Sequence, residues 1–467
     1  MKATVTPIFL ALLCALPSLF GCARRGFTGW ESVQSPIVSA QIRSFVAEKE
    51  AQAGAAARAN GGEMPAEFKR FFAAASQGDW LAVSNDFQNF RKHAPQYEHT
   101  GKTDLQLRGT AWQAVIEVWG AFDSLGRGSE KYSALYAHEI IGSIPPGSIY
   151  FGGTDPGRFL ITGMEKSQVN ADPFFLLTQN ALADSTYLDY VRSMYGKRLY
   201  IPTAKDSEKC FLDYSTDAET RARNHQLKPG ENVTVDADGR VQVSGQAAVM
   251  EINGRLAKLI FDQNSNREFY IEESLPLDWM YPYLEPHGLI LKLDRQPLAR
   301  LSDQAIKADH DYWANLIQPM IGDWLDDDTP AQDVADVAEK VHGRRDFTTF
   351  SGDKQFIQSD YACRMFSEER ANIADLYAWR AKQAADPGER ERMSRSADFA
   401  FRQAWALCPY SADATFRYAN FLAGGKKYSD ALVLAETAIR LPEMDGRARG
   451  QMRALITQLQ RLKRLHP

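Results

Sequence analysis

Residues 145–158 have the sequence Pro-Pro-Gly-Ser-Ile-Tyr-Phe-Gly-Gly-Thr-Asp-Pro-Gly-Arg, and they mark a change of structural character along the chain. Residues 148–153 are a short apolar run between turn-forming residues, which predicts a β-strand. Residues 155–166 suit a helix, with Pro156 in its first turn. Because a glycine-rich turn joins this strand to this helix, the stretch predicts the start of a domain in which strands and helices alternate.

The alternation extends over residues 142–300, a predicted α/β domain. Further strands are expected at 173–178, 199–201, 269–271 and 288–293, and further helices at 183–195 and 247–261. Since the strands are unbroken apolar runs, we expect a Rossmann-like, mostly parallel sheet with helices on its faces. Two valine-rich segments around an Asp-Gly turn predict a β-hairpin insertion near 230–245.

Helical segments are predicted on both sides of this domain. Residues 36–141 form a predicted helical region, in which Phe68, Phe71 and Phe72 lie on one face of a helix. Residues 301–360 are a predicted helical connector. The fold class is therefore multidomain α and α/β, and a chain of 467 residues is long enough for several domains.

Residues 361–464 contain a sequence repeat. Ala397 and Ala431 are 34 residues apart, and so are Ala404 and Ala438. This spacing is the tetratricopeptide period, in which small residues allow two helices to pack closely. The segment therefore predicts tetratricopeptide-like α-hairpin repeats, whose groove would hold a protein or peptide. The alternative is an ordinary helical bundle.

The first 21 residues have the features of a signal peptide. One positive charge precedes an apolar run at 8–16, which is too short to span a bilayer. The following Leu-Phe-Gly-Cys sequence resembles the lipobox of bacterial lipoproteins, which implies lipidation of Cys22 and a tether over 22–35. The expected location is the cell envelope, anchored by lipid on the periplasmic side or at the outer membrane. The alternative is a simple secretory signal with Cys22 incidental.

Composition excludes several classes of partner and cofactor. A formal net charge of -5 gives no reason to expect nucleic acid. No Cys-x-x-Cys pair is present, so no metal site and no cofactor is predicted. Cys363 and Cys408 would be able to pair if their helices are neighbours, and the alternative is that both are buried free thiols.

The glycine-rich turn is the first candidate ligand site. Gly152, Gly153, Thr154 and Asp155 follow the strand, and Arg158 lies in the first turn of the helix. Glycines let backbone approach a ligand, and an arginine is able to clamp a phosphate or carboxylate with two hydrogen bonds. The competing interpretation is structural: the glycines make a tight turn and Asp155 caps the helix.

Polar residues near two other predicted strand ends would share this crevice if the sheet is parallel. Asn180 and Asp184 follow the second strand, while Glu272 and Glu273 end the fourth. Carboxylates there would serve acid–base chemistry, or hold a sugar or a cation. Adjacent strand residues point to opposite faces, so only one of the two glutamates would face the crevice.

Two acidic segments follow in the helical connector. His310 stands between Asp309 and Asp311, which favours a solvated helix face over a ligand set. Residues 326–328 are three successive aspartates, which predict a loop that ends in a helix cap.

The segments 144–155 and 174–180 resemble the soluble domain that follows the membrane spans in a family of bacterial membrane proteins related to protein O-mannosyltransferases. The resemblance covers roughly 140–295. The larger pattern, which includes 269–280, resembles exported tetratricopeptide-repeat proteins of Verrucomicrobia-type bacteria. In the transferase-related family, catalysis belongs to a multi-spanning part that this sequence lacks, so the resemblance implies a binding domain.

The favoured function is a non-enzymatic one, that of an exported, lipid-anchored binding or scaffold protein of the cell envelope. One alternative is an enzyme of glycan or glycoconjugate metabolism that uses the α/β crevice to bind a small molecule. The other alternative is a structural envelope component.

Overall fold

The computed structural model describes residues 39–59, 61–91, 110–228, 230–235, 241–272 and 277–465. The chain forms two compact units, each built from two separate segments. Unit 1 comprises residues 1–126 and 151–267, and unit 2 comprises residues 127–150 and 268–467. The predicted signal peptide, the tether and Cys22 lie outside the described residues, so lipidation stays a prediction.

Unit 1 is mainly helical. Its elements are α1 (Ala40–Ala59), α2 (Ala66–Gln77), α3 (Trp80–Arg91), α4 (Thr110–Arg127), η4 (Pro156–Leu160), α6 (Ile161–Met164), β2 (Phe175–Thr178), η5 (Gln179–Ala181), α7 (Ser185–Tyr195), α8 (Ala204–Arg223), β3 (Asn232–Val235), β4 (Val241–Ser244) and α9 (Gln246–Gln263). A Thr203–Asp206 capping box starts α8, a helix that the sequence analysis missed although this four-residue pattern announces it.

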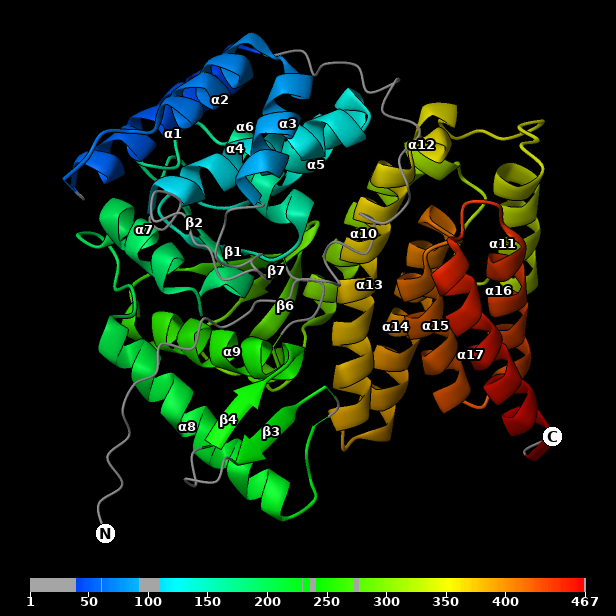
Figure 1. The fold of residues 1–467 in the computed structure, drawn as a ribbon. Coiled ribbons are helices and arrows are strands. Elements are labelled where there is room, and N and C mark those ends of the chain that lie inside the picture. The colour runs from blue at the N-terminus through cyan, green and yellow to red at the C-terminus, as the bar shows by residue number, and fades with distance from the viewer. Residues whose placement is uncertain are drawn as a thin grey trace. The chain divides into compact units, whose positions relative to one another are not determined.

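Helices α1, α2, α3 and α4 lie close together in Figure 1, and aromatic side chains fill the core between them. Phe68, Phe71 and Phe72 are buried on one face of α2, as predicted. The Phe87 ring stacks on Trp119 with centroids 4.2 Å apart, and such offset pairs stabilise a core beyond their buried area. Gly120 on α4 is required here because a Cβ atom would lie 2.3 Å from the Phe159 ring.

A buried ionic cluster joins α1, α4 and α7 in unit 1. The Lys49 side chain is 0% exposed, and its Nζ lies 2.6 Å from Glu117 Oε2 and 3.1 Å from the Tyr190 hydroxyl. Glu165 is buried beside it, and neither carboxyl oxygen has a hydrogen-bond partner among the described residues. Burial raises the pKa of Glu165 well above its ordinary value, and the nearby Glu117 adds to the shift. Burial therefore favours the protonated form of Glu165 in the folded protein.

The strands form a five-stranded sheet in the order β2-β1-β5-β7-β6 and a separate β3-β4 hairpin. Strand β1 (Ile149–Gly152) belongs to unit 2 up to Tyr150 and to unit 1 from Phe151. The β3-β4 hairpin confirms the predicted insertion, and its turn at 236–240 lies outside the described residues.

The predicted mostly parallel sheet is wrong, because the sheet is mixed. Strand β7 (Ile290–Leu293) pairs antiparallel with both β5 (Phe269–Glu272) and β6 (Leu284–His287). A tight turn at Gly288, where φ is +61°, joins β6 to β7 and forces the reversal of direction. Strand β6 contains Pro286, and proline is tolerated there because β6 is the edge strand.

The predicted strand at 199–201 is also wrong. The backbone of Tyr200 bonds to a side chain instead of a neighbouring strand. The Tyr200 N–H donates to Asn264 Oδ1 at 2.9 Å, and Asn264 Nδ2 donates to the carbonyl oxygen of Tyr200 at 3.1 Å. Because one asparagine satisfies both backbone groups, the apolar run needs no strand partner.

Unit 2 contains the rest of the sheet and nearly all the C-terminal helices. Its remaining elements are α5 (Glu130–Ser143), η6 (Tyr281–Tyr283), α10 (Asp303–Ile321), α11 (Ala331–Ala338), η7 (Glu339–Gly343), α12 (Lys354–Gln358), α13 (Asp360–Gln383), α14 (Pro387–Leu407), α15 (Ala412–Gly424), α16 (Tyr428–Arg440) and α17 (Gly446–Leu465).

Helices α13 to α17 stand side by side as successive antiparallel hairpins, orange to red in Figure 1. The small residues that define the 34-residue spacing, Ala397, Ala404, Ala431 and Ala438, are all fully buried. Small buried side chains let helix axes approach closely, which is the packing that the repeat prediction requires.

A second buried ion pair lies in unit 2. Arg370 on α13 is 0% exposed, and its Nη1 donates to both oxygens of Asp309 on α10, at 3.0 and 2.8 Å. The Tyr377 hydroxyl donates to the same carboxylate at 2.8 Å, and Arg370 Nε donates to Gln403 Oε1 at 2.8 Å. One cation and one anion are thus balanced and joined by several hydrogen bonds, which a buried pair requires to be stable, although Arg370 Nη2 has no hydrogen-bond partner among the described residues.

Candidate functional site

The glycine-rich turn at 152–158 is built by close backbone packing. A Cβ atom on Gly152 would lie 2.7 Å from the carbonyl oxygen of Gly157, so no other residue fits without a shift. The Thr154 hydroxyl accepts a hydrogen bond from Gly157 N–H at 3.1 Å. Asp155, the predicted cap, makes no capping hydrogen bond, because its backbone is already helical. Thr154 takes that role.

Arg158 is half-buried in unit 1. Its guanidinium lies 3.9 Å over the neighbouring Phe159 ring, and its Nε is buried without a hydrogen-bond partner in the described part of the chain. Arg158 therefore keeps an unsatisfied donor, and its clamp on a phosphate or carboxylate stays a prediction.

The residues predicted to share the crevice serve structural bonds. Asn180 Nδ2 donates to the carbonyl of Gly153 at 3.1 Å, which brings the end of β2 to the turn. Asp184 is the N-cap of α7, where it accepts from Thr186 N–H at 2.8 Å. Asn253 Oδ1 accepts from Ala183 N–H at 2.7 Å and braces the loop between them. These bonds give both predicted residues structural roles, while Asn180 Oδ1 is buried without a hydrogen-bond partner among the described residues.

The structure gives contacts for one of the two predicted glutamates. Glu273 lies outside the described residues, and Glu272 belongs to unit 2, where it is buried. Glu272 shares a hydrogen bond with Glu369 on α13, and the Tyr136 hydroxyl on α5 donates to Glu369 Oε1 at 2.5 Å. Burial raises the pKa of Glu369 well above its ordinary value, and the neighbouring Glu272 adds to the shift. Sequence spacing gave no sign of this pair, since its members are far apart in the chain.

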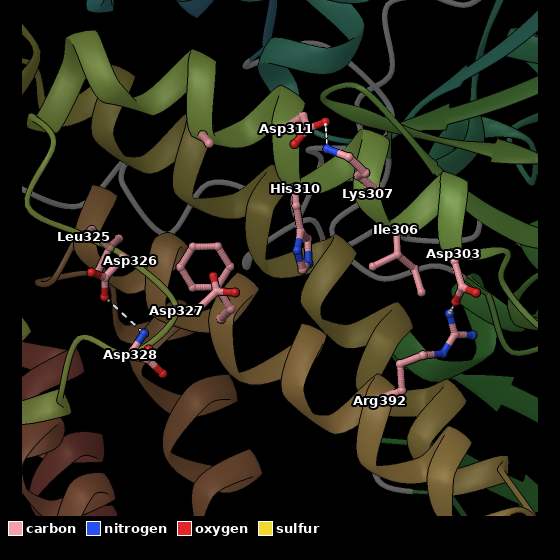
Figure 2. A pocket seen from close by; sticks show the side chains of 12 residues that line it. Asp303, Ile306, Lys307, His310, Asp311, Leu325, Asp326, Asp327, Asp328 and Arg392 are labelled. Carbon is pink, nitrogen blue, oxygen red and sulfur yellow. Dashed lines mark hydrogen bonds and ion pairs between the residues drawn. The ribbon is translucent and has the colours of Figure 1, made fainter.

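The pocket with the clearest chemistry lies within unit 2 and has a volume of about 650 Å³. Figure 2 shows that its side chains come from α10, the 325–328 segment and α14. The lining residues are Asp303, Ile306, Lys307, His310, Asp311, Ala314, Leu325, Asp326, Asp327, Asp328, Arg392 and Phe399. We call it the acidic pocket.

The acidic pocket carries an excess of negative charge. Five aspartates face two cations, and both cations already have partners: Lys307 Nζ lies 2.6 Å from Asp311, and Arg392 pairs with Asp303. Asp327 and Asp328 are exposed and form no ion pair in the ranges that the structure describes. The pocket therefore presents two unpaired carboxylates to a ligand.

Asp326 shapes the loop that carries these carboxylates. Its Oδ1 accepts from the Thr329 hydroxyl at 2.7 Å and from Asp328 N–H at 3.0 Å. The hydrogen bond from Thr329 lowers the pKa of Asp326, which keeps it ionised. The next helix begins with Pro330 as its N-cap, so the predicted cap at the end of 326–328 is wrong.

Two aromatic rings form part of the pocket wall. His310 projects from α10 into the pocket in Figure 2, and its ring lies 5.7 Å from Phe399 at 72°. Burial lowers the pKa of His310, with a further contribution from Arg370, so the ring is neutral at neutral pH. Its Nε2 is buried without a partner among the described residues. Rings beside carboxylates suit a cation with an apolar stem.

The sequence analysis predicted a solvated face at His310 and missed this pocket. The acidic pocket exists because α14 packs beside α10, and the two helices are more than 60 residues apart in sequence. The three successive aspartates at 326–328 were the sequence feature that pointed to this pocket, but such runs usually lie on a solvated surface.

No family model, curated protein or solved structure matches this chain. Among the helices that the structure covers, none has the length and apolar composition needed to cross a bilayer. Within the same ranges, no three His, Cys, Asp or Glu side chains are grouped as metal ligands would be.

Proposed function

We propose that this protein is an exported, non-enzymatic binding or scaffold protein of the cell envelope, and that its acidic pocket holds a basic segment of a partner protein. The observation that carries the proposal is the combination of Asp327 and Asp328, both unpaired, with the His310 and Phe399 rings in one pocket of about 650 Å³. A lysine or arginine side chain matches it, because the stem packs on rings while the charged end meets carboxylates.

The helical hairpins of α13 to α16 support this proposal. Phe399 lies on α14, within the segment whose 34-residue spacing matches tetratricopeptide repeats. Arrays of such hairpins present extended surfaces to peptides. We therefore propose that the repeat-like hairpins align a peptide and that the acidic pocket anchors one of its basic residues.

Fluorescence anisotropy of the purified protein with a labelled lysine-rich peptide tests the pocket. Replacing Asp327→Asn and Asp328→Asn together should weaken binding about tenfold, since each ion pair at a solvated site contributes up to about 1 kcal/mol. Phe399→Ala should weaken peptide binding by a few-fold, because it removes one of the rings on which the lysine stem packs. Binding should also weaken as ionic strength rises.

A matched control separates the pocket from general attraction to an acidic protein. Glu208→Gln with Asp213→Asn removes the same charge from exposed positions on α8 in unit 1. If this control weakens binding as much as the pocket variant does, the pocket is not the site. If no peptide binds at all, the alternative hypothesis of a structural envelope component is favoured over that of a peptide-binding protein.

The membrane anchor is a separate part of the proposal, and it rests on the Leu-Phe-Gly-Cys sequence ending at Cys22. Cells fed an alkyne-tagged fatty acid should label the wild-type protein, and Cys22→Ser should abolish both the label and recovery in the detergent phase. Export without the label would support the simple secretory signal instead.

A further inference from the structure

The α13–α14 hairpin places two cysteines opposite each other in unit 2. Ser367 Oγ on α13 donates to the carbonyl of Ala404 on α14 at 2.7 Å, which fixes the register of the two helices. In an antiparallel pair, a step back along one helix matches a step forward along the other. Cys363 lies four residues before Ser367, and Cys408 lies four residues after Ala404. The register therefore sets these two cysteines face to face.

The local contacts agree with this register. Both cysteines are free thiols in the structure and are 0% exposed, and each shares a hydrogen bond with the Tyr410 hydroxyl. A serine side chain that reaches the backbone of the next helix shows that α13 and α14 approach closely at this end of the hairpin. Close approach is what a disulfide requires, because its two Cα atoms must lie about 4.4–6.8 Å apart.

We propose that Cys363 and Cys408 form a disulfide bond across the open end of the α13–α14 hairpin. The bond would close a loop of roughly 45 residues at the end opposite the 384–386 connection. The inference rests on the proposed export, because disulfides persist in oxidising compartments outside the cytoplasm.

The chemistry is thiol–disulfide exchange with a protein or small-molecule disulfide. One cysteine loses its proton and attacks a sulfur of the oxidant, forming a mixed disulfide and releasing one thiolate. The second cysteine then attacks the mixed disulfide, which forms the Cys363–Cys408 bond and releases the second thiolate. Two protein thiols are oxidised and one external disulfide is reduced to two thiols.

Burial of the two thiols determines at which stage of folding this reaction occurs. Burial raises the pKa of Cys408 to about 12 and that of Cys363 well above its ordinary value. Because the thiolate is the attacking species, the folded protein should react slowly, and the bond should form before the hairpin closes.

Refolding and peptide mapping test the pair directly. The reduced, denatured full-length protein is refolded with a mixture of oxidised and reduced glutathione, its free thiols are alkylated, and its peptides are identified by mass spectrometry. We expect a linked peptide pair containing Cys363 and Cys408, with Cys210 alkylated. Recovery of Cys363 and Cys408 both alkylated would overturn the proposal.

Thermal unfolding supplies a second measurement. Closing a loop of this length should raise the unfolding midpoint of unit 2 by roughly 5 to 10 °C over the reduced protein. Cys363→Ala with Cys408→Ala should remove the effect of reductant, while the control Cys210→Ala at a half-buried position on α8 should retain it. A reductant effect that survives in the double variant would contradict the assignment.

Protein taken from the cell envelope distinguishes this inference from the proposed export. If the bond forms on refolding but both thiols are free in protein alkylated at cell lysis, the pairing geometry stands and the proposed export fails. If the bond is present in both samples, both proposals are supported.

Discussion

The two units each bury a cation completely, but they balance its charge differently. In unit 1, Lys49 Nζ lies 2.6 Å from Glu117, while the carboxyl group of a second buried acid, Glu165, has no hydrogen-bond partner in the part of the chain that is described. In unit 2, Arg370 faces a single carboxylate, Asp309, which Tyr377 also binds. The first cluster holds more carboxyl groups than cations, and the second is balanced one to one.

This difference indicates which buried carboxyl groups hold a proton in the folded protein. A buried acid without a cation of its own stays protonated, as the raised pKa of Glu165 shows. An arginine–carboxylate pair has no such adjustment, because arginine keeps its charge at every accessible pH. We therefore expect the unit 1 cluster to respond to pH and the unit 2 pair to resist it.

The largest effect is expected from breaking the balanced pair. Arg370→Met leaves the Asp309 carboxylate buried without a cation and should lower the free energy of unfolding by about 3–5 kcal/mol in urea titrations. Adding Asp309→Leu should recover much of the loss, since two apolar side chains then replace two charges. A double variant no more stable than the single variant would show that the loss comes from packing and not from charge.

A smaller effect is expected at the cluster with excess acid. Lys49→Met removes the cation whose Nζ lies 2.6 Å from Glu117 Oε2. The loss of stability should be about 2–3 kcal/mol at neutral pH. Urea titrations measure this loss, and an unchanged free energy of unfolding would contradict the stabilising role of the cation.

The third effect is expected from removing the stored proton, and its size depends on pH. As pH rises from the ordinary Glu pKa of 4.5, the unfolded chain releases the Glu165 proton while the folded protein keeps it. The folded state then binds more protons, so wild-type stability falls with rising pH until the folded-state pKa is reached. Glu165→Gln should match the stability of the wild type near pH 4.5 and exceed it at pH 8, by about 1.4 kcal/mol for each pH unit over which only the folded protein keeps the proton. Thermal unfolding across this range would refute the prediction if the two curves run parallel.

Local patterns predicted much of the fold. The phenylalanine spacing in α2 and the Asp-Gly hairpin needed only neighbouring residues, and both were confirmed. The strand at 199–201 failed because a distant side chain, Asn264, took the place of a strand partner. Strand β6 was missed because Pro286 argues against a strand, although an edge position tolerates it.

The candidate sites show the same limit. The close packing at Gly152 follows from its own neighbours in sequence, so the tight turn was predicted. The acidic pocket and the Glu272–Glu369 pair depend on α10, α13 and α14 meeting elements far along the chain. The residue pattern within one segment does not show which distant segments that segment will contact.

The interleaving of the two units has a consequence for the order of assembly during synthesis. Unit 1 has all of its residues once the chain has been made to Arg267. Residues 127–150, which carry α5 and the first half of β1, have by then been made, but their partners in 268–467 have not. Apolar side chains such as Tyr136 and Ile149, buried in the finished protein, are exposed during this interval. A nascent chain of this design needs either rapid completion or a chaperone that covers residues 127–150 until they are used.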